Sequence, residues 1–447
     1  MKLIQGISGV RGIVGKTLTQ KILSDHIQAF SNIQKNGDIL LARDSRIHGQ
    51  DLIKIASETL IKCGRNVFNY NIIPTPTAQF LVEKNKFAGG IVITASHNPE
   101  EWNGLKFIDY NGCFLNEEKN EALFKKINNI SNEIKTQGKI IAIKDGYLSH
   151  VEHTLKLSMI NLLAIKNKKF TVVIDAVNGA ASKALPKMLK ALGCKVYSLH
   201  CNPNGVFPRG CEPLPHNLND LKNAVIDNKA DMGFATDPDG DRLAIIDEKG
   251  IPLGEEYTLV FCIDGFLKST QSNKDIVTNL STTLAVDRIA KKYGNNVIRT
   301  AVGEINVVNK MKEINSMLGG EGNGGVILTE SHLGRDSLIG VTLFLNRMAQ
   351  TNKSVSQVFQ SMPQYIMLKD KIELNNINAE IAINKIQKAF PKAKQNHLDG
   401  LKLIWNDSWL HIRKSNTEPI IRIYAEAPTK SEVLNLINKV KSILQTK

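Results

Sequence analysis

The sequence predicts an α/β protein with three similar α/β layers in succession and a smaller α+β unit at its C-terminus. Two observations carry this prediction. Through residues 36–348, short apolar runs alternate with amphipathic helical patterns, which is the rhythm of βαβ units. After a polar stretch at 350–363, short strands dominate and one amphipathic helix closes the chain, which is typical of an α+β unit.

The expected elements follow from apolar runs bounded by turn residues. In the first layer we expect strands at 39–43, 66–70 and 89–93 and helices at 51–62 and 75–83. In the second and third layers we expect strands at 170–175, 232–236 and 276–279 and helices at 180–192, 284–292 and 305–314. In the last unit we expect strands at 401–405, 409–414 and 419–427 and a helix at 431–444.

Composition excludes several classes of protein. The chain is 42% hydrophobic and 22% charged, and no stretch approaches the ~20 apolar residues that cross a bilayer, so we expect no membrane partner. The N-terminus lacks the apolar segment of a secretory signal, which predicts a cytoplasmic protein. The six cysteines show no metal-binding spacing and are expected to be unpaired thiols.

The net charge of +14 raises the question of a nucleic-acid partner. Its cations are scattered and lack interleaved aromatic residues, so we expect none. A positive field also steers small anionic substrates. The charge therefore favours a small anion as the ligand.

One serine follows a predicted strand in a polar turn. Residues 93–103 read ITASHNPEEWN, with Ser96 beside His97 where the apolar run 89–93 ends. Ligands of open α/β sheets bind at that edge. By itself the pattern fits either an ordinary polar turn or a nucleophile.

A second loop carries three carboxylates at alternate positions. Residues 236–242 read TDPDGDR and follow the expected strand 232–236. Asp237, Asp239 and Asp241 would repel one another unless a cation joins them, and oxygen-only ligands favour Mg²⁺. The alternative is a solvated acidic turn.

Together the two loops suggest phosphoryl transfer. A phosphorylated Ser96 would add anionic oxygens to the three aspartates, while Arg242 would offset charge on the transferred group. Lys106 is a candidate acid or base if cations such as Arg11 lower its pKa; the alternative is a surface lysine on a strand.

Two further segments offer groups for a sugar phosphate. Arg413 and Arg422 flank a turn with hydroxyl and amide groups at Ser415, Asn416 and Thr417, and such a nest fits a phosphate dianion, although a decorated turn is the alternative. The glycine-rich turn 319–325 carries Glu321 and Asn323, which can bond to sugar hydroxyls or serve backbone geometry only.

Five motifs occur in the order found in the α-D-phosphohexomutases, and the resemblance covers essentially the whole chain. They are SGVRG at 8–12, TASHNP at 94–99, DPDGDR at 237–242, GEGNG at 320–324 and RKSNTEP at 413–419. The resemblance implies mixed sheets and four domains around a central cleft, each supplying one loop. The expected domains are 1–146 (phosphoserine), 147–250 (metal), 251–352 (sugar) and 366–447 (phosphate).

The resemblance also implies roles for single residues. Ser96 resembles the phosphoserine, which would join Asp237, Asp239 and Asp241 around one Mg²⁺ per chain. His97, Lys106, Arg11 and Arg242 resemble its catalytic neighbours. Glu321 and Asn323 would meet the sugar, and Arg413, Ser415, Asn416, Thr417 and Arg422 would hold the non-reacting phosphate.

The sugar loop departs from the Glu-x-Ser-Gly-His pattern of many members. Its GEGNGG form, with Trp102 and Asn103 after the serine motif, most resembles the branch assigned to phosphoglucosamine mutases. The implied reaction is reversible transfer between the 6- and 1-positions of a hexose phosphate, favouring glucosamine 6-phosphate, with a hexose bisphosphate as activator. Phosphomannomutase or phosphoglucomutase activity, a metal-dependent phosphatase and a non-catalytic sugar-phosphate binder are the alternatives, and a monomer or homodimer is expected.

Overall fold

The computed structural model of the chain describes residues 3–6, 9–127, 138–373, 378–414 and 420–445. By its internal contacts the chain forms two compact units. Unit 1 comprises residues 1–270 and 323–357, and unit 2 comprises residues 271–322 and 358–447.

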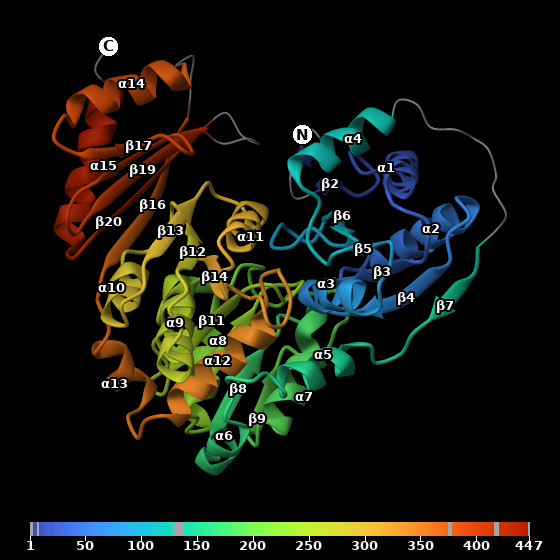
Figure 1. Cartoon of the computed structure of the whole chain (residues 1–447), viewed down its shortest axis with the longest axis horizontal. Coiled ribbons are helices and arrows are strands. Elements are labelled where there is room, and N and C mark those ends of the chain that lie inside the picture. The colour runs from blue at the N-terminus through green and yellow to red at the C-terminus, as the bar shows by residue number, and fades with distance from the viewer. Residues whose placement is uncertain (1–2, 7–8, 128–137, 374–377, 415–419, 446–447) are drawn as a thin grey trace. The chain divides into compact units, whose positions relative to one another are not determined.

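Unit 1 begins with a seven-stranded mixed sheet in the order β1-β2-β6-β5-β3-β4-β7 (Figure 1). Its strands are β1 (Ile4–Gly6), β2 (Gly9–Ile13), β3 (Ile39–Arg43), β4 (Val67–Ile72), β5 (Gly89–Ile93), β6 (Trp102–Asp109) and β7 (Ile140–Ala142). Its helices are α1 (Gln20–Ile33), α2 (Gly49–Lys62), α3 (Thr75–Lys84) and α4 (Glu117–Ile127), and α5 (Tyr147–Thr154) follows.

Both faces of this sheet are buried, which explains the continuous apolar runs of β3 and β5. Leu41 and Ile91 pack into one core with residues of α1, α2 and α4. Their neighbours Leu40 and Val92 pack into a second core with residues of α3. Since successive side chains of a strand point to opposite faces, each strand serves both cores.

A four-stranded sheet follows in the order β11-β10-β8-β9, with β10 and β11 antiparallel and the other neighbours parallel. Its strands are β8 (Thr171–Asp175), β9 (Lys195–Leu199), β10 (Met232–Thr236) and β11 (Leu243–Asp247). The helical segments are α6 (Leu162–Lys168), η1 (Ala180–Ser182), α7 (Ala184–Ala191), η2 (Pro215–Asn217) and α8 (Asn219–Asp227). Unit 1 also contains α9 (Glu255–Thr270), β15 (Gly325–Leu328) and α12 (Ser337–Ala349).

Unit 2 contains a parallel array of three strands and an antiparallel sheet. The array is β13-β12-β14, made of β12 (Ile276–Asn279), β13 (Val297–Thr300) and β14 (Leu318–Glu321), with α10 (Ala285–Lys292) and α11 (Glu304–Glu313). The antiparallel sheet has the order β16-β20-β19-β18-β17. Its strands are β16 (Ile366–Glu373), β17 (Lys394–Asn396), β18 (Leu401–Ile404), β19 (Trp409–Lys414) and β20 (Ile420–Ala427).

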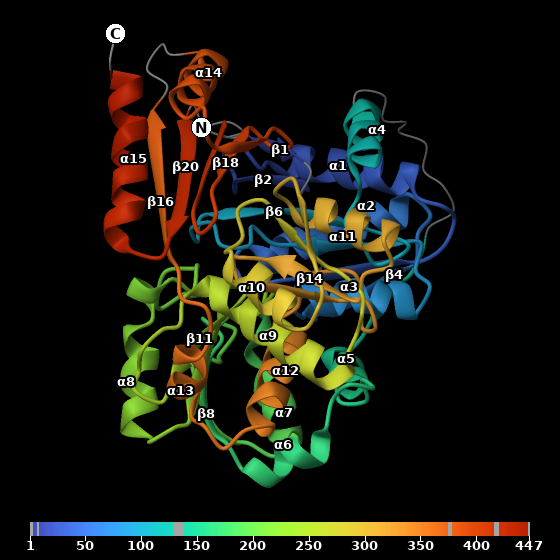
Figure 2. The ribbon, with the colours of Figure 1, turned by 60° about the vertical axis from the view of Figure 1, so that its left-hand side comes forward.

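Two helices, α14 (Ala379–Ala389) and α15 (Lys430–Gln445), cover one face of this antiparallel sheet (Figure 2). Ile412, Ile421 and Ile423 point to that face and share a core with residues of both helices. The predicted fold class, three α/β layers followed by a smaller α+β unit, is confirmed. The predicted domain boundaries stay predictions.

The polar stretch 350–363, which precedes the last unit in the sequence, contains the short helix α13 (Val355–Gln360). The carboxylate of Glu248 accepts hydrogen bonds from the hydroxyls of Ser354 and Ser356, 2.6 and 2.5 Å long, and from the Ser356 N–H. Glu248, which is distant in the sequence, therefore binds the residues at the start of α13.

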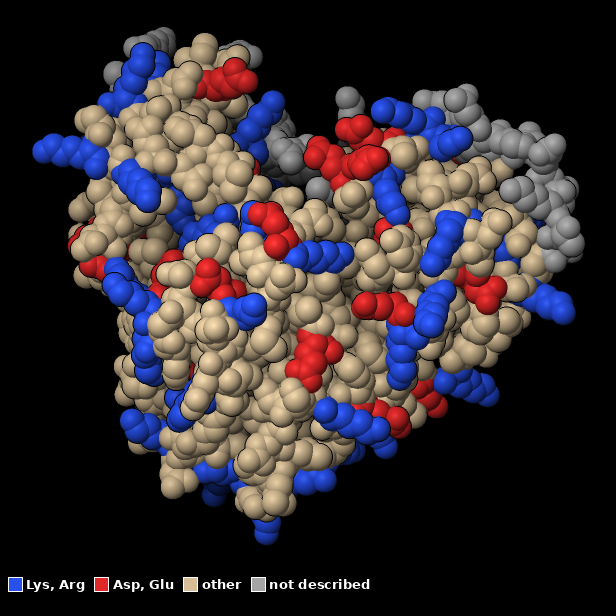
Figure 3. All heavy atoms as spheres, in the orientation of Figure 1, with Lys and Arg blue, Asp and Glu red and all other residues tan. Residues whose placement is uncertain are grey.

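The surface agrees with the expectation of scattered cations. On the face drawn in Figure 3, Lys and Arg side chains lie interspersed with Asp and Glu over many elements. No helix in the described part of the chain combines the length and apolar character needed to cross a membrane.

A buried histidine makes unit 2 sensitive to acid. The His411 Nδ1 lies 2.8 Å from the Ser281 hydroxyl and its Nε2 lies 2.7 Å from the Asp399 carbonyl oxygen, so the neutral ring is satisfied on both sides. Burial, aided by the charge of Lys402, lowers its pKa to about 4. Folding therefore disfavours the protonated ring.

We expect this histidine to cost unit 2 stability on acidification. The free energy of unfolding keeps its full value above pH 6.5, the approximate pKa of a histidine in the unfolded chain. It falls by on the order of 3 kcal/mol as the pH drops to about 4. Denaturation followed by tryptophan fluorescence, with Trp409 as the buried reporter, should show a steeper loss in the wild type than in His411→Asn. Equal slopes would contradict the assignment.

Candidate active site

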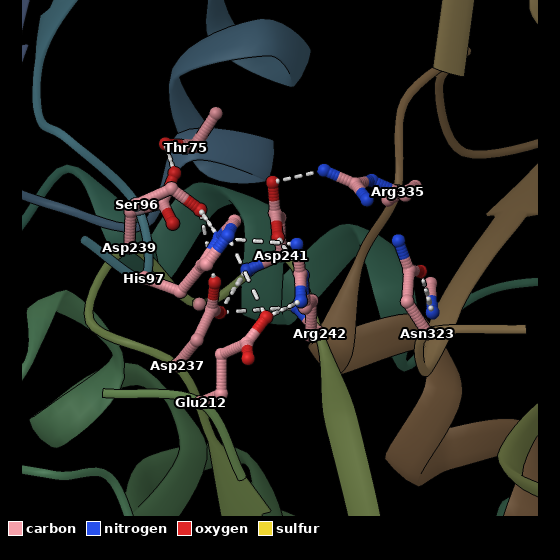
Figure 4. A network of polar contacts seen from close by, with 12 residues as sticks. Thr75, Ser96, His97, Glu212, Asp237, Asp239, Asp241, Arg242, Asn323 and Arg335 are labelled. Atoms are coloured by element: carbon pink, nitrogen blue, oxygen red, sulfur yellow. Dashed lines mark hydrogen bonds and ion pairs between the residues drawn. The ribbon is translucent and has the colours of Figure 1, made fainter. Parts of the chain in front are cut away.

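Ser96 lies in the turn that follows β5, at the carboxyl edge of the first sheet. It is 1% exposed and has a positive φ of 51°, a conformation uncommon outside glycine. Its Oγ lies 3.3 Å from Asp237 Oδ2 and 3.3 Å from His97 Nδ1. The turn thus brings the predicted nucleophile to the predicted metal loop, as Figure 4 shows.

The three aspartates lie in the tight loop between β10 and β11, which pair with Thr236 opposite Leu243. All three are buried, and one carboxylate oxygen from each lies within 4.8 Å of the others. Asp237 Oδ1 accepts the N–H groups of Asp241 and Arg242, each at 3.2 Å. The antiparallel pairing of these two strands therefore holds the carboxylates together.

The carboxylate oxygens of this cluster are ligands that suit a hard divalent cation. Among the described residues, Asp239 Oδ1 and Asp241 Oδ1 are buried without a hydrogen-bond partner. Asp237 Oδ2 accepts a hydrogen bond from the Ser96 hydroxyl. Buried acceptors without donors are costly, and a cation would satisfy them. Burial and the charges of Asp241 and Asp239 raise the pKa of Asp237 well above its usual range, which a bound cation would reverse.

Lys106 on β6 joins this cluster directly. Its Nζ donates to Asp239 Oδ2 at 2.6 Å and to Asp241 Oδ2 at 3.0 Å. The condition for an acid or base role, a lowered pKa, is not met, although Arg11 does act in that direction. Burial alone would lower the pKa, but the two carboxylates outweigh burial, Arg335 and Arg11, so the pKa is raised and the ammonium stays charged.

His97 lies between the serine and a guanidinium. Arg242 Nη2 lies 3.1 Å from His97 Nδ1, and since arginine only donates, Nδ1 must accept this bond. Burial and the charges of Arg242 and Arg11 hold the pKa of His97 well below its usual value. A neutral ring whose lone pair already faces an arginine is a poor base for Ser96, which argues against a Ser–His couple.

Arg11 on β2 reaches the serine turn. Its Nη1 donates to Asn98 Oδ1 at 3.0 Å. β2 pairs with β6, and the register places Arg11 opposite Gly104. A Cβ at Gly104 would lie 2.2 Å from the Val10 carbonyl oxygen, so this close approach of the two strands requires glycine.

Six residues that were not expected from the sequence also contact the site. Thr75 Oγ1 donates to Asp239 Oδ2 at 2.6 Å, Arg335 Nη2 donates to Asp241 Oδ2 at 2.8 Å, and Glu212 Oε1 accepts from Arg242 Nη1 at 2.8 Å. The other three, Asp44, Arg46 and Thr94, support the serine turn. Asp44 and Arg46 directly follow the strand 39–43, and their charge at a strand end was a signal that could have found them.

The two predicted sugar-binding residues belong to different units. Asn323 belongs to unit 1, where its Oδ1 accepts the Gly325 N–H at 3.2 Å. Glu321 is buried at the end of β14 in unit 2, and its Oε1 accepts from Asn279 Nδ2 at 2.7 Å and from the Gly303 N–H at 3.1 Å. Glu321 is thus oriented by two donors of its own unit.

The two predicted phosphate-binding arginines lie side by side in unit 2. Arg413 on β19 is directly opposite Arg422 on β20, and Lys371 on β16 is opposite Arg422 on its other side. Directly opposite residues share a face, so three cations line the sheet face away from the core. Arg413 also donates to Asp399 at 2.9 Å. Ser415, Asn416 and Thr417 lie outside the described residues.

Four family profiles match the chain in sequence. They are described as "Phosphoglucomutase/phosphomannomutase, alpha/beta/alpha domain I", domain II and domain III, and as the C-terminal domain of the same proteins. The matches cover residues 2–134, 145–250, 254–365 and 376–442.

Two curated relatives are similar over nearly their whole length. A phosphoglucosamine/phosphogalactosamine mutase from Sulfurisphaera tokodaii is 34% identical, covering 99% of each chain. A phosphoglucomutase/phosphomannomutase from Thermococcus kodakarensis is also 34% identical, covering 96% of this chain and 95% of the relative.

Solved structures share the fold. A phosphoglucomutase/phosphomannomutase family protein from Burkholderia thailandensis has a TM-score of 0.86 at 24% identity, covering 99% of this chain and 98% of the other. The N-acetylphosphoglucosamine mutase from Aspergillus fumigatus in complex with GlcNAc-6P and magnesium has a TM-score of 0.62 at 14% identity, covering 99% and 96%. With four matching domains in order and full-length relatives, this chain belongs to the α-D-phosphohexomutase family of isomerases.

Proposed function

We propose that this chain moves a phosphoryl group reversibly between the 6- and 1-positions of a hexose phosphate by way of a phosphorylated Ser96. The observation that carries the proposal is the buried Ser96 Oγ, 3.3 Å from Asp237 Oδ2 within the three-aspartate cluster. In the first transfer the Oγ–phosphorus bond breaks while a sugar oxygen forms the new oxygen–phosphorus bond, and the proton of that sugar hydroxyl ends on the departing Ser96 Oγ. The bisphosphate then returns its other phosphoryl group to Ser96.

Asp237, Asp239, Asp241 and Ser96 would hold one Mg²⁺, which would supply positive charge to the transferring phosphoryl oxygens. The buried oxygens without donors support this assignment, as does the complex of the Aspergillus fumigatus enzyme with magnesium. The positively charged groups around the cluster include Arg11, Lys106, Arg242 and Arg335. We propose that Lys106 contributes charge and hydrogen-bond donors, because its pKa is raised.

The proposed substrate is glucosamine 6-phosphate, which is converted to glucosamine 1-phosphate. The names of several relatives support the amino sugar, among them the Sulfurisphaera tokodaii enzyme and a probable phosphoglucosamine mutase from Methanopyrus kandleri, 28% identical. The Thermococcus kodakarensis relative is named phosphoglucomutase/phosphomannomutase and is 34% identical, as is the Sulfurisphaera tokodaii enzyme. Glu321 and Asn323 are the proposed sugar contacts, and either an amine or a hydroxyl satisfies such groups.

The activity is tested with purified protein, Mg²⁺ and a hexose bisphosphate activator. Intact-mass analysis should find one phosphoryl group on Ser96, and the four phosphates of glucosamine, N-acetylglucosamine, glucose and mannose should be compared by kcat/KM. We expect the highest value for glucosamine phosphate. Absence of both phosphoserine and 1-to-6 conversion would refute the proposal, and phosphate release at the rate of isomerisation would favour a phosphatase.

We propose that Arg413 and Arg422 of unit 2 bind the phosphate that is not being transferred, with Lys371 beside them. Asp399 pairs with Arg413, and a phosphate dianion could bind the positive charge and the hydrogen-bond donors that these neighbouring strands bring together. Replacing Arg422 by Ala should raise KM for the hexose phosphate about 10-fold or more, since a charged hydrogen bond contributes about 1.5–3 kcal/mol. Mg²⁺ affinity should stay unchanged.

The control for this variant is Arg288→Ala, which removes another arginine of unit 2, one that pairs with Asp407 at 2.6 Å. Its KM should be close to that of the wild type. If Arg422→Ala weakened Mg²⁺ binding as much as it weakened substrate binding, the separate phosphate site would be wrong.

A further inference from the structure

A buried guanidinium lies inside the serine turn. Arg46 follows β3 and is 1% exposed. Its Nη2 donates to the carbonyl oxygens of Ser96 and Asn98, each at 2.7 Å. Its Nη1 donates to the carbonyl oxygens of Pro99 and Trp102 at 2.5 and 3.1 Å. One side chain thus gathers four carbonyl groups of the segment that carries the nucleophile.

Asp44 orients this arginine and ties it to the backbone of Ser96. Asp44 Oδ2 accepts from Arg46 Nε at 3.0 Å and from the Thr94 hydroxyl at 2.6 Å. The Thr94 oxygen in turn accepts the N–H of Ser96 at 2.9 Å. The turn is therefore held on both sides of Ser96, at its N–H through Thr94 and at its carbonyl through Arg46.

The turn needs this support because its backbone is strained. A non-glycine residue in the left-handed region is strained and keeps this conformation only where surrounding contacts hold it. The 3.3 Å separation of Ser96 Oγ from Asp237 Oδ2 depends on that conformation. Without Arg46, the carbonyl groups of Ser96, Asn98, Pro99 and Trp102 would each lose a hydrogen-bond donor, and that of Ser96 is buried.

The same guanidinium also contacts the segment that supports the aspartate loop. The Phe207 ring lies 5.2 Å from the Arg46 guanidinium carbon, and the Phe207 N–H donates to Glu100 Oε1 at 2.8 Å. Two residues further on, Arg209 donates to the Thr236 carbonyl oxygen at 2.8 Å, at the residue before Asp237. Residues 207–209 therefore contact both loops whose spacing the transfer requires.

We propose that Arg46, oriented by Asp44, is a positioning residue that sets Ser96 against Asp237 for phosphoryl transfer. This inference rests on the proposed function. The role is geometric rather than electrostatic, because Asp44 pairs with the guanidinium at 3.0 Å and offsets its charge. Lysine keeps the charge but has no planar fork of donors, so it cannot replace arginine here.

The test is Arg46→Lys, with Arg65→Lys as the matched control. Arg65 also donates to four carbonyl groups, those of Ser31, Gln34, Lys35 and Gly37. It precedes β4 at the amino edge of the sheet, whereas Ser96 follows β5 at the carboxyl edge, and both strands are parallel to β3. Both variants lose the same kind of bond, but only one contacts the serine turn.

In Arg46→Lys we expect kcat to fall about 100-fold, since a displacement of about 1 Å costs that much, while KM and Mg²⁺ affinity stay near the wild-type values. Hydrogen exchange of the backbone amides of 94–102 should rise in this variant alone. Arg65→Lys should lower Tm without changing kcat. Unchanged kcat in folded Arg46→Lys, or an equal loss in Arg65→Lys, would overturn the proposal.

A second pair of variants serves if Arg46→Lys does not fold. Thr94→Val removes the hydroxyl that links Asp44 to Ser96 and should lower kcat in the same way, whereas Thr94→Ser should restore it. Wild-type kcat in Thr94→Val would count against the proposal. If the wild type itself showed no mutase activity, the proposed function would fail and the transfer role with it, while hydrogen exchange would still decide whether Arg46 holds the turn.

Discussion

Replacing Ser96 by Ala is expected to abolish isomerisation and the phosphorylation of the chain. In the proposed reaction this hydroxyl receives the phosphoryl group and gives it up again. Among the described hydroxyl groups, that of Ser96 is the one that hydrogen-bonds to Asp237 Oδ2. We expect kcat to fall by at least about three orders of magnitude, as for other covalent nucleophiles. The measurements are conversion of the 1-phosphate and intact mass.

The fold should survive this change. Alanine tolerates the backbone at Ser96 about as well as serine does, and the turn keeps its bonds to Arg46 and Thr94. The control is Ser57→Ala, which removes another buried hydroxyl, one that donates only to the Ile53 carbonyl oxygen in α2. Ser57→Ala should keep full turnover. Wild-type activity in Ser96→Ala would place the nucleophile elsewhere.

Replacing Asp239 by Asn is expected to remove both Mg²⁺ binding and turnover. The change takes one of three negative charges from the cluster and one partner from Lys106. Fewer anionic ligands bind a hard cation less tightly. A ligand that binds only the folded state raises Tm, so the wild type should show a Mg²⁺-dependent rise in Tm that Asp239→Asn lacks.

The control is Asp247→Asn, at the other end of the hairpin formed by β10 and β11. Asp247 is also buried, but its Oδ1 accepts the backbone N–H groups of Lys249 and Ile251 and it is outside the cluster. Asp247→Asn should keep the Mg²⁺-dependent rise in Tm even where its own stability falls. A full rise in Asp239→Asn would exclude Asp239 as a ligand and leave the cation to other groups.

Strands were predictable where apolar runs end at turn residues. The expected bounds of β3, β5, β10, β12 and β19 agree with the structure. These runs are buried on at least one face, so burial and local pattern point to the same element. The helix α13 has a local signal that the prediction missed, because Ser354 and Gln357 form a capping box in which Gln357 Oε1 accepts the Ser354 N–H at 2.9 Å. The distant Glu248 adds hydrogen bonds that no local pattern indicates.

The site was predictable where its chemistry lies in one short segment. Ser96 with His97, and Asp237 with Asp239 and Asp241, are local patterns, and the structure brings both loops together. Arg335 meets Asp241 from 94 positions away along the chain, and no pattern near it indicates this. Such partners are decided by how strands and helices pack.

The sequence by itself determined the fold class and indicated a candidate nucleophile and a cluster of three carboxylates, because each depends on residues close together in the chain. Only the tertiary structure decided the state of the groups around them. The pKa of Lys106 is raised because packing places two buried carboxylates beside its ammonium. The pKa of His97 is lowered because packing buries its ring and places Arg242 and Arg11 near it. Protonation depends on burial and on the sum of nearby charges, and both come from segments that meet only when the chain is folded.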